Sequence, residues 1–319
     1  MFTYLLFFIG FFLLIKGADL LVEGSASIAK KFNISRIVIG LTIVAFGTSA
    51  PEFVVNIFAS INGNTEIAIG NILGSNIVNI MLILGLSAII YPIAAKKNTT
   101  WKEIPLSLLA ALLVGIMAND MRFDGASFSG LTRIDGMVLL AFFIIFIYYS
   151  FGIAKITGEV TNEVEIKDRK QSISVFCIIL GLLSLVVGGK WIVDGAVSIA
   201  HSLNISESLI GLTIVAIGTS LPELATSVIA AYKKQTDIAI GNIVGSNIFN
   251  VFLILGASSV IRPLPFSPSS DIDILMTVFA SAILFFAMFI GRRHVLERWQ
   301  GALMILFYIG YVAFLISTK

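Results

Sequence analysis

The sequence predicts an all-α polytopic membrane protein with about ten transmembrane helices, in two inverted five-helix repeats with broken core helices. Composition is the first indication. Of the 319 residues, 57% are hydrophobic and 13% are charged, whereas soluble domains carry roughly 25% charged residues. A soluble core cannot absorb so much apolar surface, but lipid can. The other two indications are the number of long apolar segments and an internal repeat.

Ten segments are apolar and long enough to cross a bilayer, which requires about 20 residues each. The first begins without a basic region before it, so we expect a transmembrane helix there and not a cleaved signal peptide. The chain is expected to comprise a first half (1–160), a charged cytoplasmic linker (161–172) and a second half (173–319). The apolar segments are 2–22, 37–61, 67–93, 103–119, 134–154, 173–193, 208–231, 238–261, 272–291 and 299–316.

Lysine and arginine residues set the expected orientation, because cytoplasmic loops of membrane proteins are enriched in them. With the N-terminus outside, the inward loops carry fifteen of these residues and the outward segments carry four. This bias predicts a multi-pass protein of the cell membrane with both termini outside. The inward residues are Lys30, Lys31, Arg36, Lys96, Lys97, Lys102, Lys155, Lys167, Arg169, Lys170, Lys233, Lys234, Arg292, Arg293 and Arg298, and the outward residues are Arg122, Arg133, Arg262 and Lys319.

An internal repeat relates the two halves of the chain at a shift of 171 residues. GLTIVAFGTSAPE at 40–52 matches GLTIVAIGTSLPE at 211–223 at eleven of thirteen positions. TEIAIGNILGSNIVN at 65–79 matches TDIAIGNIVGSNIFN at 236–250 at twelve of fifteen positions. Each half holds five predicted spans, an odd number, so the second half must cross the membrane upside down. Inverted repeats of this kind are typical of transporters that open alternately to either side.

The repeated motifs each place a glutamate, Glu52 or Glu223, deep in an apolar span. A charged residue at the bilayer centre costs about 2.5–3.5 kcal/mol on insertion scales, so the pair costs about 5–7 kcal/mol. We expect no lysine or arginine at similar depth in a neighbouring span, so a bound cation is the best candidate to offset this cost. A structural role for two protonated glutamates is the alternative.

A proline precedes each glutamate and is expected to break the helix there. Pro51 cannot donate a hydrogen bond to the carbonyl of Gly47, and Pro222 stands in the same relation to Gly218. Broken helices at membrane depth occur where the backbone lines a cavity or is buried in protein. We therefore expect free backbone carbonyls facing a cavity, such as those of the paired residues Ala45 and Ala216.

The remaining polar residues of the two motifs supply oxygen atoms. Thr48 lies four residues before Glu52, and Ser75 lies four before Asn79, so each pair shares a helix face. Hard cations such as Ca²⁺ and Na⁺ prefer oxygen ligands, whereas zinc and copper sites use nitrogen or sulfur. Two glutamates carry a charge of −2, which one Ca²⁺ would neutralise. Several Na⁺ ions could occupy the same oxygens, and competition for shared ligands is a simple route to exchange.

These motifs, GTS-x-PE and GN-x-x-GSN-x-x-N, each present twice in register, resemble those of the sodium/calcium exchanger branch of the cation/calcium exchanger superfamily, prokaryotic type. The resemblance covers nearly the whole chain. It implies Na⁺/Ca²⁺ antiport by alternating access, with ion sites between four core helices and sliding of the first and sixth helices over them. The ion-binding residues that it implies are Ala45, Thr48, Ser49, Glu52, Ser75, Asn79, Ala216, Thr219, Ser220, Glu223, Ser246 and Asn250.

Other functions remain open on the sequence. Proton/calcium or other divalent antiport is the main alternative, although the GN-x-x-E pattern of proton/calcium relatives is absent. Potassium-dependent members carry aspartate where this chain has Asn250, which argues against potassium cotransport. A channel would conduct without obligatory exchange. An enzyme is not expected, because no nucleophile–base pair is evident, and we expect no cofactor, no obligate protein partner and, at a net charge of +2, no nucleic acid.

Overall fold

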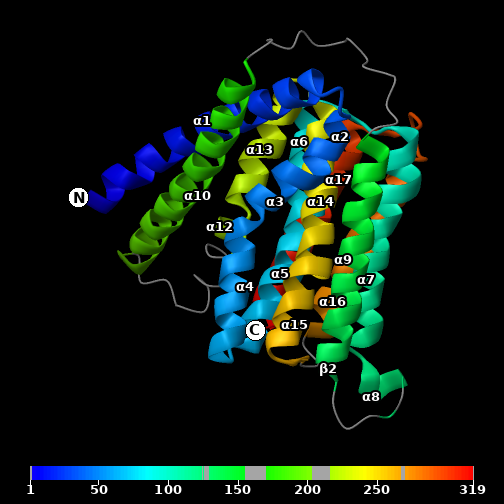
Figure 1. Cartoon of the computed structure of the whole chain (residues 1–319). Coiled ribbons are helices and arrows are strands. Elements are labelled where there is room, and N and C mark those ends of the chain that lie inside the picture. Colours follow the sequence, from blue (N-terminus) through cyan, green and yellow to red (C-terminus); the bar gives the residue numbers. More distant parts are fainter. Residues whose placement is uncertain are drawn as a thin grey trace.

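The computed structural model describes residues 2–123, 125, 129–154, 170–202, 216–266 and 270–318. Helices dominate these residues (Figure 1). Several of them continue into short π-helical segments, which we label η. The helical elements are α1 (Phe2–Lys31), α2 (Arg36–Ile39), η1 (Gly40–Val44), α3 (Ala45–Thr48), α4 (Ala50–Asn62), α5 (Thr65–Ile77), η2 (Val78–Leu84), α6 (Gly85–Ile90), η3 (Thr99–Glu103), α7 (Ile104–Met117), α8 (Asp120–Phe123), α9 (Arg133–Ala154), α10 (Gln171–Ser202), α12 (Ala216–Thr219), α13 (Leu221–Tyr232), α14 (Thr236–Ile248), η5 (Phe249–Leu255), α15 (Gly256–Ile261), α16 (Ser270–Ala287) and α17 (Arg298–Thr318).

The predicted spans are largely confirmed. Eight helices of the described residues are long and apolar enough to cross a membrane, and a ninth span is formed if the bent pair Arg36–Thr48 and Ala50–Asn62 counts as one. The remaining predicted segment, 208–231, lies partly outside the described residues, as does most of the predicted linker at 161–172. The predicted boundary of the first span is wrong, because α1 continues to Lys31 through the polar stretch after residue 22.

The repeat of the sequence reappears in the order of the elements. The run α5–η2–α6 corresponds residue for residue to α14–η5–α15 at the shift of 171, including the limits of both π-helical segments. The strands follow the same symmetry. β1 (Ile93–Ala94) pairs antiparallel with β4 (Val295–Leu296), and β2 (Gly130–Leu131) pairs antiparallel with β3 (Leu264–Pro265). Each ribbon therefore joins one repeat to the other.

The helices α1 and α10 occupy equivalent places in the two repeats and pack against each other in opposite directions, which confirms the inversion (Figure 1). Glycines allow the two backbones to approach closely. A Cβ atom at Gly10 would lie 2.8 Å from the carbonyl oxygen of Gly188, and one at Gly181 would lie 2.7 Å from that of Gly17. Small residues play this part between membrane helices generally, because they let backbones come together.

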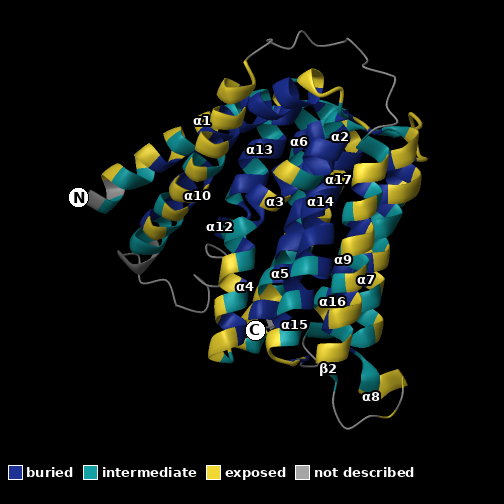
Figure 2. Ribbon diagram, viewed as in Figure 1, coloured by how far each residue is buried: buried dark blue, intermediate teal, exposed yellow. Residues whose placement is uncertain are grey.

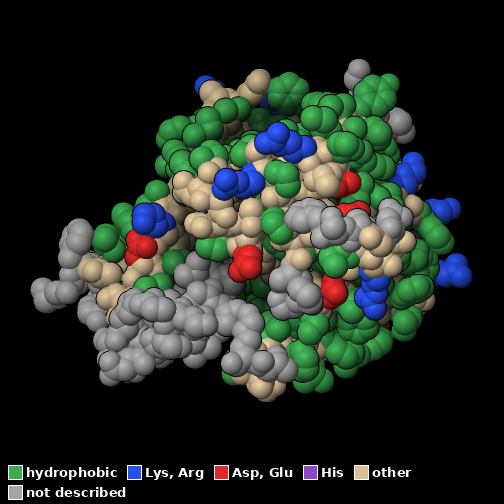
Figure 3. Space-filling view, turned by 90° about the horizontal axis from the view of Figure 1, so that it is seen from below, with side chains coloured by type: hydrophobic (Ala, Val, Ile, Leu, Met, Phe, Trp, Pro, Cys, Tyr) green, Lys and Arg blue, Asp and Glu red, His purple; other side chains and the backbone are tan. Residues whose placement is uncertain are grey.

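The repeated motifs form the centre of the molecule, and the other helices surround them (Figure 2). Within the span Thr236–Ile261, 94% of the most apolar window is buried inside the protein, against 17% for Arg133–Ala154 and for Arg298–Ser317. The peripheral helices thus expose large apolar side chains, as expected of a surface in contact with lipid. Apolar side chains also cover much of the end of the molecule seen in Figure 3.

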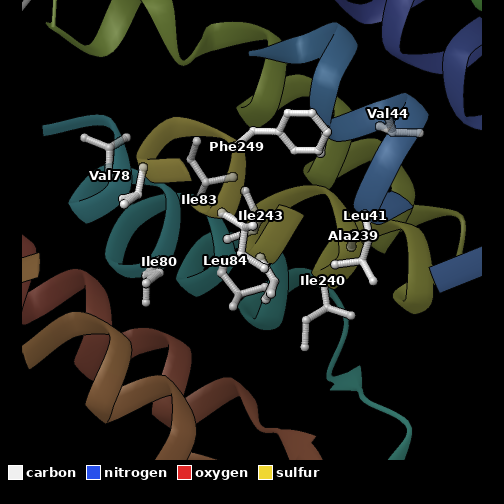
Figure 4. Packing of buried hydrophobic residues seen from close by; sticks show 14 of the residues in the cluster. Leu41, Val44, Val78, Ile80, Ile83, Leu84, Ala239, Ile240, Ile243 and Phe249 are labelled. Atoms are coloured by element: carbon white, nitrogen blue, oxygen red, sulfur yellow. The ribbon is translucent and has the colours of Figure 1, made fainter. Parts of the chain in front are cut away.

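Apolar side chains from both repeats interlock in the core (Figure 4). Leu41 and Val44 of η1 pack with residues of α14, while Ile83 and Leu84 of η2 approach Ile243 from the other repeat. The two halves therefore share one hydrophobic core. This core fixes the position of the polar residues that lie between the halves.

Candidate ion-binding site

The helices break where the prolines predicted a break. Ser49 separates α3 from α4 with backbone angles φ −81° and ψ 7°, and Ser220 separates α12 from α13 with φ −87° and ψ 6°. The two helical segments around Ser49 meet at an angle of 48°. Each break places a glutamate, Glu52 or Glu223, in the first turn of the following helix, where the helix dipole favours a negative charge.

Both glutamates are fully buried, with 0% of each residue exposed, in the centre of the molecule. They lie near each other, because Ser49, three residues before Glu52, donates a hydrogen bond to Glu223. In an apolar interior, two carboxylates with no cationic partner are unfavourable unless a cation or protons neutralise them. Among the described residues, no group of three or more His, Cys, Asp or Glu side chains could hold a metal ion, so other oxygen atoms must complete any ion site.

Serine side chains connect each glutamate to both repeats. Ser49 donates a hydrogen bond of 2.8 Å to Oε1 of Glu223, and Ser220 lies 3.5 Å from Oε1 of Glu52. Within each repeat, Ser75 approaches Oε1 of Glu52 at 3.4 Å, and Ser246 approaches Oε1 of Glu223 at 3.4 Å. Every contact in this set has a counterpart in the other repeat. The site therefore lies on the pseudo-symmetry axis and needs both copies.

Asparagine side chains form a second symmetric set beside the glutamates. Asn79 donates to Oδ1 of Asn247 at 3.0 Å, and Asn250 donates to Oδ1 of Asn76 at 3.0 Å. Asn250 also approaches the hydroxyl of Ser75 at 3.3 Å. Sequence analysis did not single out Asn76 or Asn247. Their identity in the two copies of the second motif, at membrane depth, is the signal that could have found them.

The motif threonines also contact the opposite repeat. Thr48 donates to Oδ1 of Asn242 at 2.9 Å, and Thr219 donates to Oδ1 of Asn71 at 3.3 Å. Asn242 is itself bonded to the hydroxyl of Ser227 at 3.0 Å. The threonines thus hold the amides that flank the glutamates, and Asn71 and Asn242 are further residues that sequence analysis missed.

Four oxygen atoms at the site have no hydrogen-bond partner although they are buried. Each glutamate presents one unpartnered carboxylate oxygen, and each of two asparagines presents one unpartnered amide oxygen. They are Oε2 of Glu52, Oε2 of Glu223, Oδ1 of Asn79 and Oδ1 of Asn250. Buried acceptors are rarely left without partners. Carboxylate and amide oxygens are ligands for hard cations, so this set fits a cation as substrate.

Two expectations from the sequence need correction. The carbonyl oxygen of Ala45 is not free, because it accepts hydrogen bonds from the backbone N–H of Ser49 at 3.0 Å and from the hydroxyl of Thr48 at 3.3 Å. A neighbouring span does carry a lysine beside the cavity, because Lys190 of α10 lines it together with Pro51 and Pro222. Its partner is Asp194, at 3.0 Å. Ala216, the counterpart of Ala45, begins α12, and its side chain lies outside the described part of the chain.

A predominantly helical membrane protein with inverted repeats, helices broken at mid-length and an oxygen-lined polar centre belongs to the class of secondary transporters. Comparison with known proteins narrows this class. The family model described as sodium/calcium exchanger protein matches residues 2–152 and 173–317, and this chain belongs to that family.

Individual relatives match along their full length. The chain is 38% identical over 319 residues to CaxA of Alkalimonas amylolytica, which carries an antiporter name, with 97% of each chain covered. It is 31% identical over 344 residues to the sodium/calcium exchanger MaX1 of Methanosarcina acetivorans, with 98% of each covered. A solved structure of the sodium-calcium exchanger NCX_Mj superposes with a TM-score of 0.84 at 37% identity and covers 98% of both chains.

Proposed function

We propose that this protein exchanges Na⁺ for Ca²⁺ across the cell membrane by alternating access, and that the two ions compete for the oxygens around Glu52 and Glu223. The single observation that carries this proposal is the symmetric site itself. One buried glutamate from each repeat is bonded to a serine of the other repeat, and four oxygens there have no partner. A doubly charged cation would neutralise both carboxylates and fill the unpartnered acceptors.

The donor set favours Ca²⁺ and Na⁺ over transition metals. The unpartnered atoms belong to two carboxylates and two amides, and serine hydroxyls surround them. Ca²⁺ accepts six to eight oxygen ligands in flexible geometry at about 2.3–2.6 Å. Na⁺ ions occupying the same oxygens would displace Ca²⁺, and this competition couples the two fluxes. The relatives MaX1 and NCX_Mj are both named as exchangers of this pair of ions.

Alternating access is supported by a difference between two sides of the molecule, which we call the α10 side and the α1 side. On the α10 side, α4, α10, α12 and α13 line a cavity of about 380 Å³ that reaches Pro51 and Pro222. On the α1 side, the residues equivalent to the cavity-lining Gly189 and Val193 are Ala18 and Val22, which are buried at 0% and 1% exposure.

An ion-pair cluster accompanies the packing on the α1 side. Lys233, which follows α13, contacts the carboxylates of Asp19 and Glu23 on α1. This arrangement fits a transporter open toward one side and closed toward the other. Movement of α1 and α10 over the core would exchange the two arrangements, because the repeats are equivalent. We retain the orientation set by the lysine and arginine bias, with both termini outside the cell.

Exchange is tested in proteoliposomes that are loaded with Na⁺ and diluted into Na⁺-free buffer containing labelled Ca²⁺. We expect Ca²⁺ uptake that stops when internal Na⁺ is replaced by choline. Glu52→Gln and Glu223→Gln should each abolish uptake, because each removes one of the two charges that balance Ca²⁺. Glu66→Gln is the matched control, since Glu66 is exposed at the start of α5. Normal uptake by either site variant refutes the site.

Proton/calcium exchange is the second candidate, and the close pair of carboxylates favours it. Two neighbouring carboxylates repel each other when both are ionised, so a proton bound by one of them stabilises the pair. The same vesicles separate the candidates. Ca²⁺ uptake driven by a pH gradient without Na⁺ would favour protons, and uptake that requires internal Na⁺ at constant pH would favour Na⁺. Potassium-dependent uptake is not expected, because Asn250 adds no third carboxylate to the site.

A further inference from the structure

A charged pair lies on α10 beside the cavity that reaches the ion site. Lys190 and Asp194 are one helical turn apart, and their Nζ and Oδ2 atoms are 3.0 Å apart. Both residues line the cavity of about 380 Å³, together with Pro51, Pro222 and Thr219. The cavity wall thus runs from this charged pair to the residues next to Glu52 and Glu223.

The position of the pair indicates water and not lipid around it. The helix α10 continues to Ser202, and Lys190 lies twelve residues before that end, or about 18 Å along the helix axis. Charged side chains at such depth face the protein interior or a water-filled cavity, because hydrocarbon does not solvate them. The side chains are 70% and 50% exposed, and the cavity supplies the space for water.

The equivalent positions in the other repeat carry a different charge. Asp19 and Glu23 of α1 correspond to Lys190 and Asp194 of α10 at the shift of 171 residues. Both acids on α1 contact Lys233, which directly follows α13. The group on the α1 side therefore has a formal net charge of −1, whereas the pair on the α10 side is neutral. The equivalent acids Glu23 and Asp194 are each paired with a lysine. The lysine that pairs with Asp194 lies on the same helix, α10, whereas the lysine that pairs with Glu23 follows α13.

On the basis of the exchange function above, we propose that Asp194 draws cations into the cavity on the α10 side and that Lys190 competes with them for it. Lys190 acts as a tethered cation. It holds Asp194 in an ion pair within the helix, and it repels ions that approach Glu52 and Glu223. Lys190 therefore raises the cation concentration needed for half-maximal transport from the α10 side, and it leaves the α1 side unaffected.

The expected size of the effect follows from Coulomb's law in water. One unit charge about 10 Å from a divalent ion changes its binding about threefold at 0.01 M salt, where the screening length is about 30 Å. The change for a monovalent ion is about 1.7-fold, because its interaction energy is halved. At 1 M salt the screening length is about 3 Å, and the effect falls below about 10%.

The test compares the Ca²⁺ concentration for half-maximal uptake in right-side-out and inverted membrane vesicles, at low and high salt. Lys190→Gln should lower this concentration about threefold at 0.01 M salt on one face only, with no change at 1 M salt. Asp194→Asn should raise it, and the double variant should return toward the wild-type value. Lys190→Arg keeps the charge and should behave as wild type. Arg133→Gln, an exposed charge removed from α9 away from the cavity, is the control.

An unchanged concentration in Lys190→Gln at low salt overturns the proposal, as does an equal shift on both faces or a shift that persists at 1 M salt. The rate of Ca²⁺ association with the purified protein in nanodiscs, followed with a calcium-sensitive dye, separates this result from failure of the exchange function. If the wild type binds Ca²⁺ without exchanging it, exchange is refuted. A faster association of Ca²⁺ with Lys190→Gln would still support the proposed roles of Lys190 and Asp194 in the cavity. Absence of Ca²⁺ binding by the wild type refutes both.

Discussion

Ser49 makes the shortest hydrogen bond between the two repeats at the site, and its replacement by alanine is expected to weaken Ca²⁺ binding. Its hydroxyl donates to Oε1 of Glu223 at 2.8 Å. The equivalent contact from Ser220 to Glu52 is 3.5 Å long, at the limit of hydrogen bonding. Ser220 also lies 3.1 Å from the hydroxyl of Ser75, which competes for it. The two symmetric contacts are therefore unequal.

The lengths of these contacts set the size of the expected effects. A hydrogen bond to a charged group contributes about 1.5–3 kcal/mol, and the loss of a residue that orients a metal ligand typically weakens metal binding about 10- to 100-fold. Ser49→Ala should fall in that range. Ser220→Ala should weaken binding less than about tenfold, because its contact with Glu52 is long and Ser75 still approaches the same oxygen.

Calorimetric titration of Ca²⁺ into the purified protein in Na⁺-free nanodiscs measures both effects. Ser281→Ala is the matched control, because Ser281 is equally buried but donates to the carbonyl of Thr277 in its own helix at 3.0 Å. Wild-type affinity in Ser49→Ala refutes the proposed contribution of this contact. An equal loss in Ser281→Ala shows that the variants act on the fold and not on the site.

Three further predictions follow from contacts of the described residues. Lys233→Gln removes two ion pairs to α1, worth about 0.2–1 kcal/mol each. In that background, Val22→Cys should therefore react about two- to thirtyfold faster with an impermeant thiol reagent. Gly181→Leu overfills the contact between α1 and α10, because even a Cβ atom at this position would lie 2.7 Å from a carbonyl oxygen of α1. Thermal unfolding should show that the protein loses about 1–3 kcal/mol of stability. Gly310→Ala is the control and should lose none, because a Cβ atom there meets nothing within 4 Å. Asn250→Asp loses two donated hydrogen bonds and adds a charge, so its unfolding temperature without Ca²⁺ should fall and should rise more than that of the wild type when Ca²⁺ is added.

Much of the fold could be predicted because a helix that crosses the lipid bilayer must be apolar over about 20 residues. The peripheral helices α9 and α17 begin and end within two residues of the predicted spans 134–154 and 299–316, because apolar length alone defines them. The helix α1 was predicted too short, because Asp19 and Glu23 end the apolar run. Contacts with Lys233 and packing against α10 carry the helix further.

The site was predictable in its members but not in its connections. Polar residues that repeat at membrane depth identified Glu52 and Glu223, since packing alone does not account for such residues. Which serine contacts which glutamate depends on how the repeats meet, over a separation of 174 residues for Ser49 and Glu223. Ala45 shows the same limit, because a helix break removes some backbone hydrogen bonds while side chains such as that of Thr48 restore others.

Anomalous scattering from crystals grown with Sr²⁺, a heavy substitute for Ca²⁺, locates the ion directly. The peak should lie between the carboxylates of Glu52 and Glu223, with oxygen atoms of both repeats about 2.3–2.8 Å away, close to the distances typical of Ca²⁺. It should disappear when Na⁺ replaces Sr²⁺ in the crystal. A peak bound by one repeat alone, or one that lies away from both carboxylates, contradicts a shared site for the transported ion.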